Sequence, residues 1–225
     1  MQKFAIIVAG GSGKRMQDRT PKQFLPLAGK PILTRTLMAF SVFDKNLSII
    51  LVLPEQQIDY WQETCKKNGF RLAHNLVAGG QTRFHSVKNG LRHINGNDGL
   101  VAVHDGVRPL VSTATISRCF HTAEKKGNAI PVIPLTESAR KINGDKSLAF
   151  NRDEIRVVQT PQVFRLDILN KAYEQEYEDC FTDDASVVER IGHEIHLVEG
   201  NQENIKITTK MDLIVAGSLL GTFKP

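Results

Sequence analysis

Residues 4–27 read FAIIVAGGSGKRMQDRTPKQFLPL, a segment that combines a strand pattern, a glycine turn and several cations. The apolar run Phe4–Ala9 is typical of a buried strand. Glycines at positions 10, 11 and 13 follow it, and they allow a tight turn whose backbone N–H groups can approach an anion. Together with the cations, this turn predicts a loop that holds a triphosphate. The cations that we expect to act on phosphate are Lys14, Arg15 and Lys22.

Two common phosphate motifs do not fit this segment. A P-loop requires G-x-x-x-x-G-K-[ST], but Lys14 is followed by Arg15. The dinucleotide fingerprint G-x-G-x-x-G has Met16 where its third glycine belongs, so an NAD-dependent enzyme is not expected. The alternative for residues 10–15 is an ordinary glycine-rich turn with solvated basic side chains.

The composition indicates a soluble globular protein. The chain has 225 residues, of which 41% are hydrophobic and 24% charged, and we predict a single domain over residues 1–225. No apolar window is long enough for a membrane span, and Phe4–Ala9 is too short for a signal peptide. The three cysteines are widely spaced and form no C-x-x-C motif, so we expect no disulfides and a cytoplasmic location.

The net charge of +5 raises the question of nucleic-acid binding. The cations are spread along the chain, and no basic stripe with interleaved aromatic residues accompanies them. We therefore expect no nucleic-acid partner and attribute the positive charge in part to small phosphorylated ligands.

Strand and helix patterns alternate through the first 135 residues, which predicts an α/β fold with a mostly parallel sheet flanked by helices on both faces. Ligands of such sheets bind beyond the carboxyl ends of the strands. Three polar segments fall there: Gly10–Arg15, Gly79–Arg83 and Asp105–Arg108. We expect strands at 48–53, 71–77, 100–104 and 129–135, and helices at 31–43, 55–68, 83–94 and 115–126.

The alternation breaks at about residues 137–157. Asn143-Gly144 is a typical two-residue hairpin turn, with strand patterns at 139–142 and 148–151. The segment therefore predicts a protruding β-arm. Two interpretations remain open: the edges of the arm pair with a second copy of the chain, or the arm is a free surface hairpin. Further helices are expected at 166–176, 185–191 and 212–220, and a strand at 195–199.

Several polar residues could carry chemistry. Asp105 follows a strand beside the predicted phosphate loop, so it either binds Mg²⁺ or caps a turn. A carboxylate of Thr182–Asp184 is expected to cap the helix that follows, and Thr182 is placed to meet a substrate group or solvent. Lys206 lies in an apolar, β-like run, where a solvated edge lysine is the ordinary interpretation. We expect His104 to be packed or hydrogen-bonded rather than a ligand.

Other catalytic motifs are missing from the sequence. It has no G-x-S-x-G elbow, no H-E-x-x-H pair and no setting typical of a catalytic cysteine. Glycine loops, cations and one carboxylate suit phosphoryl or nucleotidyl transfer, in which positioning and charge stabilisation do most of the catalytic work.

Six segments then match a known pattern, in order and over nearly the whole chain. They are Ala9–Met16 with Pro21–Leu25, Gly79–Arg83 with Ser86-Val87, Val103–Pro109, Gln159–Gln162, Thr182–Ser186 and Glu199–Lys206. Together they resemble the 2-C-methyl-D-erythritol 4-phosphate cytidylyltransferase family of the non-mevalonate isoprenoid pathway. The resemblance implies a Rossmann-like nucleotidyltransferase domain of the glycosyltransferase-A-like type, whose β-arm forms a homodimer.

The resemblance also implies a reaction of CTP with methylerythritol phosphate, assisted by Mg²⁺. Arg15 and Lys22 would stabilise charge on the phosphates, Asp105 would hold the metal and Lys206 would touch both substrates. Arg152 would reach the site from the partner's arm. The residues implied to line the nucleotide pocket are Ala9, Gly10, Gly11, Gly80, Gln81, Ser86 and Gly106. Those implied to surround the polyol phosphate are Arg108, Thr160 and Thr182.

Three positions depart from the family pattern. Gly10 replaces a common alanine, Gln81 stands where an acidic residue is frequent, and Glu137-Ser138 replaces Asp-Thr. The change at Gln81 puts a ribose contact in question, and the role of Ser138 is open.

Two other functions remain as alternatives. Ribitol-5-phosphate cytidylyltransferase shares the phosphate loop, the Pro-Lys-Gln stretch and the Asp-x-x-Arg-Pro turn. Ser86-Val87 with Gly90-Leu91, and Asn204–Thr208, favour the methylerythritol enzyme. A non-catalytic nucleotide-binding regulator does not need Arg15, Lys22, Asp105 and Lys206 together.

Overall fold

The computed structural model describes residues 1–10, 20–96 and 98–221, and it confirms the predicted α/β class. Its main sheet has eight strands in the order β10-β7-β11-β6-β1-β4-β5, with β12 paired to β7. The strands are β1 Lys3–Val8, β4 Ser48–Leu53, β5 Asn75–Ala78, β6 Leu100–Asp105, β7 Asn128–Pro134, β10 Arg156–Val158, β11 Gln162–Arg165 and β12 Leu197–Glu199.

The centre of the sheet is parallel. β1 pairs in parallel with β4 and with β6, and β4 pairs in parallel with β5. In this register Val8 lies opposite both Val52 and Asp105, so these strands end at the same edge. Gly10 after β1, Gly80 after β5 and Asp105 at the end of β6 line one cavity at this edge, as the sequence predicted; residues 11–15 of the first polar segment lie outside the described residues.

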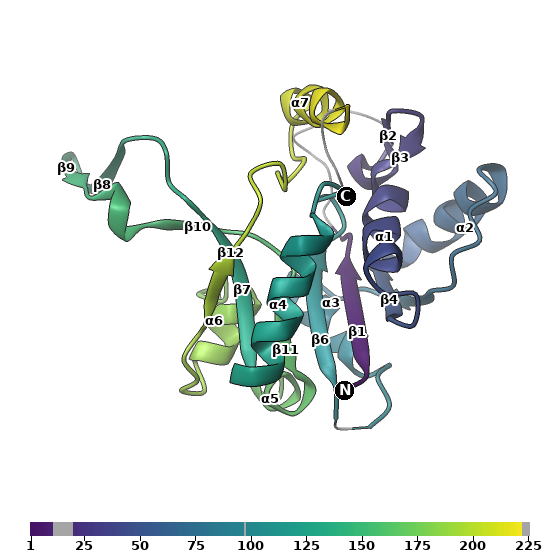
Figure 1. Cartoon of the computed structure of the whole chain (residues 1–225), viewed down its shortest axis with the longest axis horizontal. Helices are drawn as coiled ribbons and strands as arrows, with labels where there is room; N and C mark the ends of the chain where they lie inside the picture. The colour runs from purple at the N-terminus through teal and green to yellow at the C-terminus, as the bar shows by residue number, and fades with distance from the viewer. Residues whose placement is uncertain (11–19, 97, 222–225) are drawn as a thin grey trace.

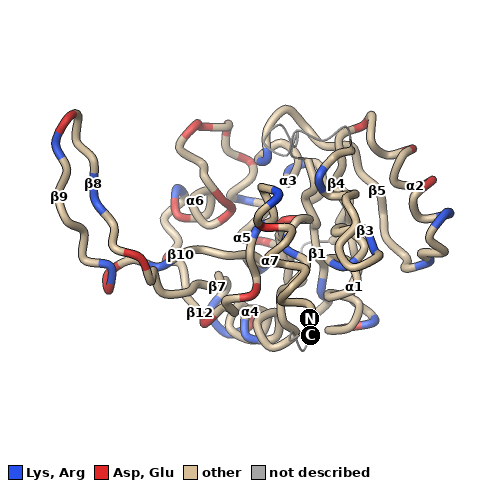
Figure 2. The backbone as a smooth tube through the Cα atoms, turned by 90° about the horizontal axis from the view of Figure 1, so that it is seen from above, with Lys and Arg blue, Asp and Glu red and all other residues tan. Residues whose placement is uncertain are grey.

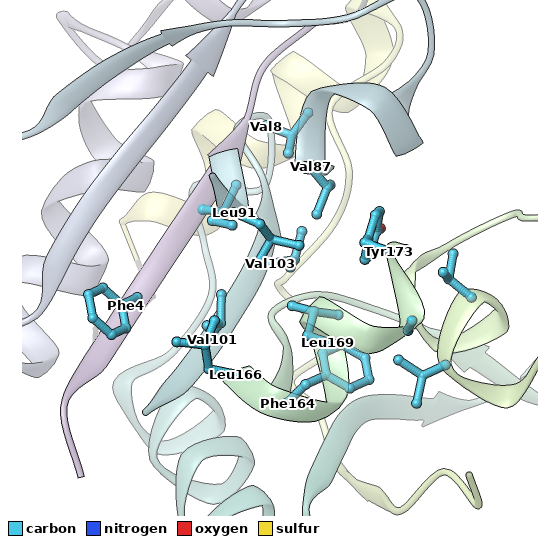
Figure 3. Close-up of a cluster of buried hydrophobic side chains, with 14 of the residues drawn as sticks. Phe4, Val8, Val87, Leu91, Val101, Val103, Phe164, Leu166, Leu169 and Tyr173 are labelled. Atoms are coloured by element: carbon cyan, nitrogen blue, oxygen red, sulfur yellow. The ribbon is translucent and has the colours of Figure 1, made fainter. Parts of the chain in front are cut away.

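Alternating residues of β1 face opposite cores. Phe4, Ile6 and Val8 belong to one apolar cluster, together with side chains of α3, α5 and α6 (Figure 3). Ala5 and Ile7 belong to the other, together with side chains of α1, α2 and α4. Helices therefore cover both faces of the sheet (Figure 1). The helices are α1 Ile32–Phe43, α2 Ile58–Lys67, α3 Arg83–Leu91, α4 Thr113–Lys126, α5 Leu166–Ala172, α6 Asp184–Glu189 and α7 Lys210–Leu220.

A third cluster attaches the C-terminal segment near the strand ends. Ile207 and Ala216 pack with Leu25, Leu27 and Val107, among other residues. The backbone N–H of Ile207 also donates to the carbonyl of Val107 at 2.9 Å. Lys206, next to Ile207, is thereby fixed close to the end of β6. The short strands β2 Pro26–Leu27 and β3 Lys30–Pro31 form a hairpin in the same region.

The predicted arm is confirmed as a hairpin of β8 Ala139–Asn143 and β9 Lys146–Phe150, which extends away from the sheet (Figure 1). Gly144 has φ +57°, a left-handed conformation that glycine adopts without strain. The side chains of Ile142 and Leu148 are 69% and 67% exposed, so the arm presents apolar surface to solvent.

The structure differs from the sequence-based strand predictions at three places. β10 and β11 were not predicted, because they have three and four residues and pair antiparallel to β7 and β6. β5 begins at Asn75 rather than at residue 71. The run around Lys206 is not a strand of the sheet. Short segments of this kind are identified as strands by the partners that they meet in the fold.

Lys and Arg are dispersed along the chain and alternate with acidic residues (Figure 2). Among the residues that the structure describes, no helix has the length and apolarity that crossing a membrane demands.

Candidate active site

Two adjoining cavities lie at the carboxyl ends of the parallel strands, with volumes of about 250 and 290 Å³. Three charged residues line both of them: Arg83, Asp105 and Lys206. The first cavity is also lined by Ala9, Gly10, Lys22, Gly80, Gln81 and Ser86. The second is also lined by Arg108, Thr160 and Thr182.

Asp105 is the last residue of β6, and cations surround its carboxylate. Oδ2 lies 3.0 Å from Lys206 Nζ and 3.1 Å from Arg108 Nε, while Oδ1 lies 3.8 Å from Arg83 Nε. Burial raises the pKa of the carboxyl, but the three cations outweigh burial and hold the pKa well below its usual range. Asp105 is therefore ionised throughout the neutral range.

The first cavity is built from backbone and small side chains. The peptide N–H of Ala9 donates to the carbonyl of Val52, so the chain continues the strand direction into the cavity wall. Gln23 Nε2 donates to the carbonyl of Ala9 at 2.9 Å, and this bond fixes the orientation of the carbonyl. On the opposite wall, the N–H of Gly80 donates to Ser86 Oγ, which is part of α3. Such walls present oriented peptide groups to a ligand.

The second cavity is organised by Thr160 and Arg108. Thr160 Oγ1 accepts from the N–H of Asp105 at 3.1 Å and contacts His104 Nδ1 at 3.0 Å. Arg108 Nη1 donates to the carbonyl of Asn204 at 2.8 Å, while its Nε faces Asp105. Arg108 thereby joins the end of β6 to the segment that carries Lys206.

His104 is packed and hydrogen-bonded, as the sequence predicted. Its side chain is fully buried, and its Nε2 lies 3.1 Å from the carbonyl of Arg108. Burial lowers the pKa of His104 to about 4. In the neutral ring, Nε2–H donates to that carbonyl and Nδ1 accepts from Thr160, so both ring nitrogens are satisfied.

Comparison with known proteins decides between the candidate families. The family model described as "2-C-methyl-D-erythritol 4-phosphate cytidylyltransferase" matches residues 3–222. The chain belongs to this family. As a member of the 2-C-methyl-D-erythritol 4-phosphate cytidylyltransferase family, it is a CTP-dependent nucleotidyltransferase.

Relatives cover the chain almost completely. A protein of Bacteroides fragilis named 2-C-methyl-D-erythritol 4-phosphate cytidylyltransferase is 54% identical over 98% of this chain and 100% of its own length. The crystal structure of 4-diphosphocytidyl-2C-methyl-D-erythritol synthase from Anaerococcus prevotii superimposes with a TM-score of 0.82 at 29% identity, over 98% of both chains. That of the cytidylyltransferase from Thermus thermophilus gives 0.77 at 30% identity, over 97% and 98%.

Most of the family residues that the sequence predicted lie at these cavities, and the exceptions are informative. Gly11 and Arg15 lie outside the described residues. Gly106 does not line either cavity: it lies behind the wall, where a Cβ would come within 2.7 Å of Ala9 Cβ. Arg152 is exposed on the arm, and its Nη1 donates to the carbonyl of Thr136 at 2.9 Å. Arg152 lines neither cavity of its own chain.

Sequence reasoning missed the roles of Arg83 and Gln23 in this cytidylyltransferase site. Arg83 lines both cavities and pairs with the buried Asp184 through Nη1 at 2.9 Å and Nη2 at 2.6 Å. Its position in the first turn of a helix after Gly79-Gly80 was a signal, but its partner lies 101 residues away. The cap assigned to Thr182–Asp184 is confirmed, since Asp183 is the N-cap of α6 and its side chain accepts from the N–H of Ser186.

The donor set fits one divalent cation brought in with phosphate. Within residues 1–10, 20–96 and 98–221, no group of three or more His, Cys, Asp and Glu side chains could hold a metal. Mg²⁺ does not need such a group, because it keeps several waters and binds one or two carboxylates together with substrate phosphates. Asp105 supplies one carboxylate at the junction, and Lys206 and Arg108 both make their closest approach to its Oδ2 rather than to Oδ1.

Proposed function

We propose that the chain transfers CMP from CTP to 2-C-methyl-D-erythritol 4-phosphate, giving 4-diphosphocytidyl-2-C-methyl-D-erythritol and pyrophosphate. The observation that carries this proposal is the pair of adjoining cavities that share Arg83, Asp105 and Lys206. A transferase of this kind needs two anionic substrates to meet at one charged junction. The first cavity is assigned to CTP and the second to the polyol phosphate.

The chemistry requires charge stabilisation rather than a base. An oxygen of the polyol phosphate, already an anion, attacks the α-phosphorus of CTP as the bond to the β-phosphate oxygen breaks. Negative charge develops on the α-phosphoryl oxygens and on the leaving pyrophosphate. We propose that Lys22, which lines the first cavity, and Lys206, which lines both, stabilise this charge together with Arg15.

Mg²⁺ is proposed as the cofactor, with Asp105 as its protein ligand. When bound, the ion would neutralise triphosphate charge and orient the phosphates. Arg83, Arg108 and Lys206 keep the Asp105 carboxylate ionised and therefore ready to bind a cation.

Pyrophosphate release tests the function directly. Purified protein would be mixed with CTP and Mg²⁺ and either 2-C-methyl-D-erythritol 4-phosphate or ribitol 5-phosphate. We expect a clear kcat/KM preference for the first, lost in Lys22→Ala and kept in Lys30→Ala, a control at an exposed lysine of β3. A preference for ribitol 5-phosphate would show that the chain is a ribitol-5-phosphate cytidylyltransferase instead. CTP binding without turnover on either substrate would favour a regulator.

We further propose a homodimer through the β-arm in the cytoplasm. The arm exposes Ile142, Leu148 and Phe150, and covering them with a second chain would remove apolar surface from water. In such a dimer Arg152, at the base of the arm, would reach the polyol-phosphate cavity of the partner subunit. The cytoplasmic location is supported by the three cysteines, all of which are free thiols.

A further inference from the structure

The Arg83 guanidinium lies between two carboxylates that differ in their surroundings. Nη1 and Nη2 donate to both oxygens of Asp184 at 2.9 and 2.6 Å, in the bidentate arrangement that fixes the guanidinium plane. Nε, which donates to neither oxygen of Asp184, faces Asp105 Oδ1 at 3.8 Å. The Nη1 and Nη2 atoms of Arg83 therefore bind an interior residue, and its Nε faces the junction of the two cavities.

Asp184 is held rigidly in the interior. Its side chain is fully buried, and Tyr173 Oη donates to its Oδ1 at 2.7 Å. Burial and the neighbouring Asp184 raise the pKa of Tyr173, so its hydroxyl stays a donor at neutral pH. Arg83, Tyr173 and Asp184 come from α3, from the end of α5 and from the start of α6, which are all packed on one core cluster.

Arg83 approaches a different oxygen of Asp105 than the other two cations do. Oδ2 is held at hydrogen-bond distance by Lys206 and Arg108, two residues assigned to the substrates. Arg83 makes its closest approach to the other oxygen, with Nε 3.8 Å from Oδ1. Lys206 and Arg108 are assigned to bind the substrate phosphates. Arg83 is instead held in position by Asp184, a residue of the protein interior.

We propose that Arg83 is a positioning residue of this enzyme: Tyr173 and Asp184 fix its guanidinium, and the fixed guanidinium keeps the Asp105 carboxylate aimed at the cavity junction. The inference rests on the proposed function, because it assigns Arg83 to the transfer step. Asp184 and Tyr173 line neither of the two cavities, so they act through Arg83.

The test uses Arg83→Lys, Asp184→Asn and the double variant in single-turnover and steady-state assays. Lysine keeps the charge but cannot bridge two carboxylates with a planar fork. We expect each single variant to lower the single-turnover rate by about 10- to 100-fold, with KM for both substrates within about 3-fold of wild type. Because both act through one guanidinium, the double variant should lose no more than the worse single one.

A control is the exposed pair of Arg165 and Asp167, in which two guanidinium donors, Nε and Nη2, also bond both carboxylate oxygens, at 3.1 and 2.8 Å. Arg165→Lys should leave the rate unchanged. If Arg83→Lys fails to fold by circular dichroism, Tyr173→Phe takes its place, since it removes only the hydroxyl donor, and it should lower the rate several-fold.

Several results would overturn the inference. They are multiplicative effects in the double variant, a raised KM with the rate kept, or a lower melting temperature with the rate unchanged. Wild-type protein that turns over neither polyol phosphate would instead refute the proposed function. The two failures are therefore distinguishable.

Discussion

At the scale of single residues, the site depends on how one buried carboxylate is surrounded. Asp105 is ionised because three cations from three different segments face it. The carboxylate in turn positions the cations, because it holds each of them near the junction before substrate arrives. Preorganised charge of this kind needs little rearrangement during the reaction.

Lys206 provides the first residue-scale prediction. Its ammonium lies 3.0 Å from Asp105 at the junction, while its side chain is 43% exposed, so removal should affect catalysis far more than folding. We expect Lys206→Met to lower kcat/KM by about 10²- to 10³-fold, as for loss of one transition-state donor. Lys210→Met, at the exposed start of α7, is the control and should keep full activity. Near-normal turnover of Lys206→Met would assign Lys206 to the solvated surface instead.

His104 provides a prediction on pH and stability. Its folded-state pKa of about 4 lies below the value of about 6.5 that an unfolded chain has. Between these values the unfolded state binds more protons, so the free energy of unfolding falls as the pH falls. We expect a loss of about 2 kcal/mol between pH 7 and pH 5 from this residue.

Urea unfolding at both pH values would measure this loss. His104→Gln cannot titrate, so the part of the pH dependence that is due to His104 should disappear in this variant. An equal loss in the variant and in wild type would show that other groups cause the pH dependence.

At the scale of elements, the ends of β1 and β6 approach closely enough that glycine is required between them. A Cβ at Gly106 would lie 2.7 Å from Ala9 Cβ and 3.2 Å from Leu33 Cδ1. Both neighbours are fully packed, so neither can move away at low cost. Gly106 therefore helps to set the position of Ala9 in the wall of the first cavity, although Gly106 itself does not line that cavity.

This contact predicts the outcome of Gly106→Ala. The added methyl group should destabilise the protein by about 1–3 kcal/mol and raise KM for CTP, because the strand end that carries Ala9 must shift. Gly10→Ala is the matched control, since a Cβ there meets nothing within 4 Å among the described residues. Thermal unfolding and CTP kinetics of both variants would test the difference. Equal behaviour of the two variants would contradict the packing argument.

At the scale of the whole molecule, the arm is the feature that a single chain does not explain. β8 and β9 pair with one another and extend from the domain (Figure 1). Isolated two-stranded hairpins are only marginally stable in water. In the register of the hairpin Ile142 lies on one face, and Leu148 and Phe150 lie on the other. A second chain that covers both faces of the arm would supply the missing contacts.

The arm therefore predicts a dimer that depends on its exposed apolar residues. Light scattering coupled to gel filtration should give about twice the chain mass of 25.1 kDa for wild type. The double variant Ile142→Glu with Leu148→Glu should be monomeric. It should also lose activity, because Arg152 would no longer reach the cavity of a partner subunit. Ile214→Glu changes an equally exposed residue of α7 and should remain dimeric. A monomeric wild type with full activity would show that the arm is a free hairpin.

The sequence by itself determined the parallel core, the hairpin arm and most of the cavity walls. Strand runs such as Ser48–Leu53, the glycine turns after them and Asn143-Gly144 are local signals, since they depend on residues that are neighbours in the chain. The carboxyl ends of parallel strands must share an edge, so the sequence alone predicted that Gly10, Gly80 and Asp105 lie together. The family resemblance, carried by the same segments, was confirmed.

Only the tertiary structure decided which side chains touch. The pairing of Arg83 with Asp184 joins residues 101 apart, and Asp105 meets Lys206 only because Ile207 packs in the cluster beside Val107. The strand β11 is likewise too short to identify without β6 and β7 on its two sides. Local patterns set secondary structure through nearby backbone and side-chain preferences. Contacts between distant residues depend on how complete elements pack, and this information is distributed over the whole core.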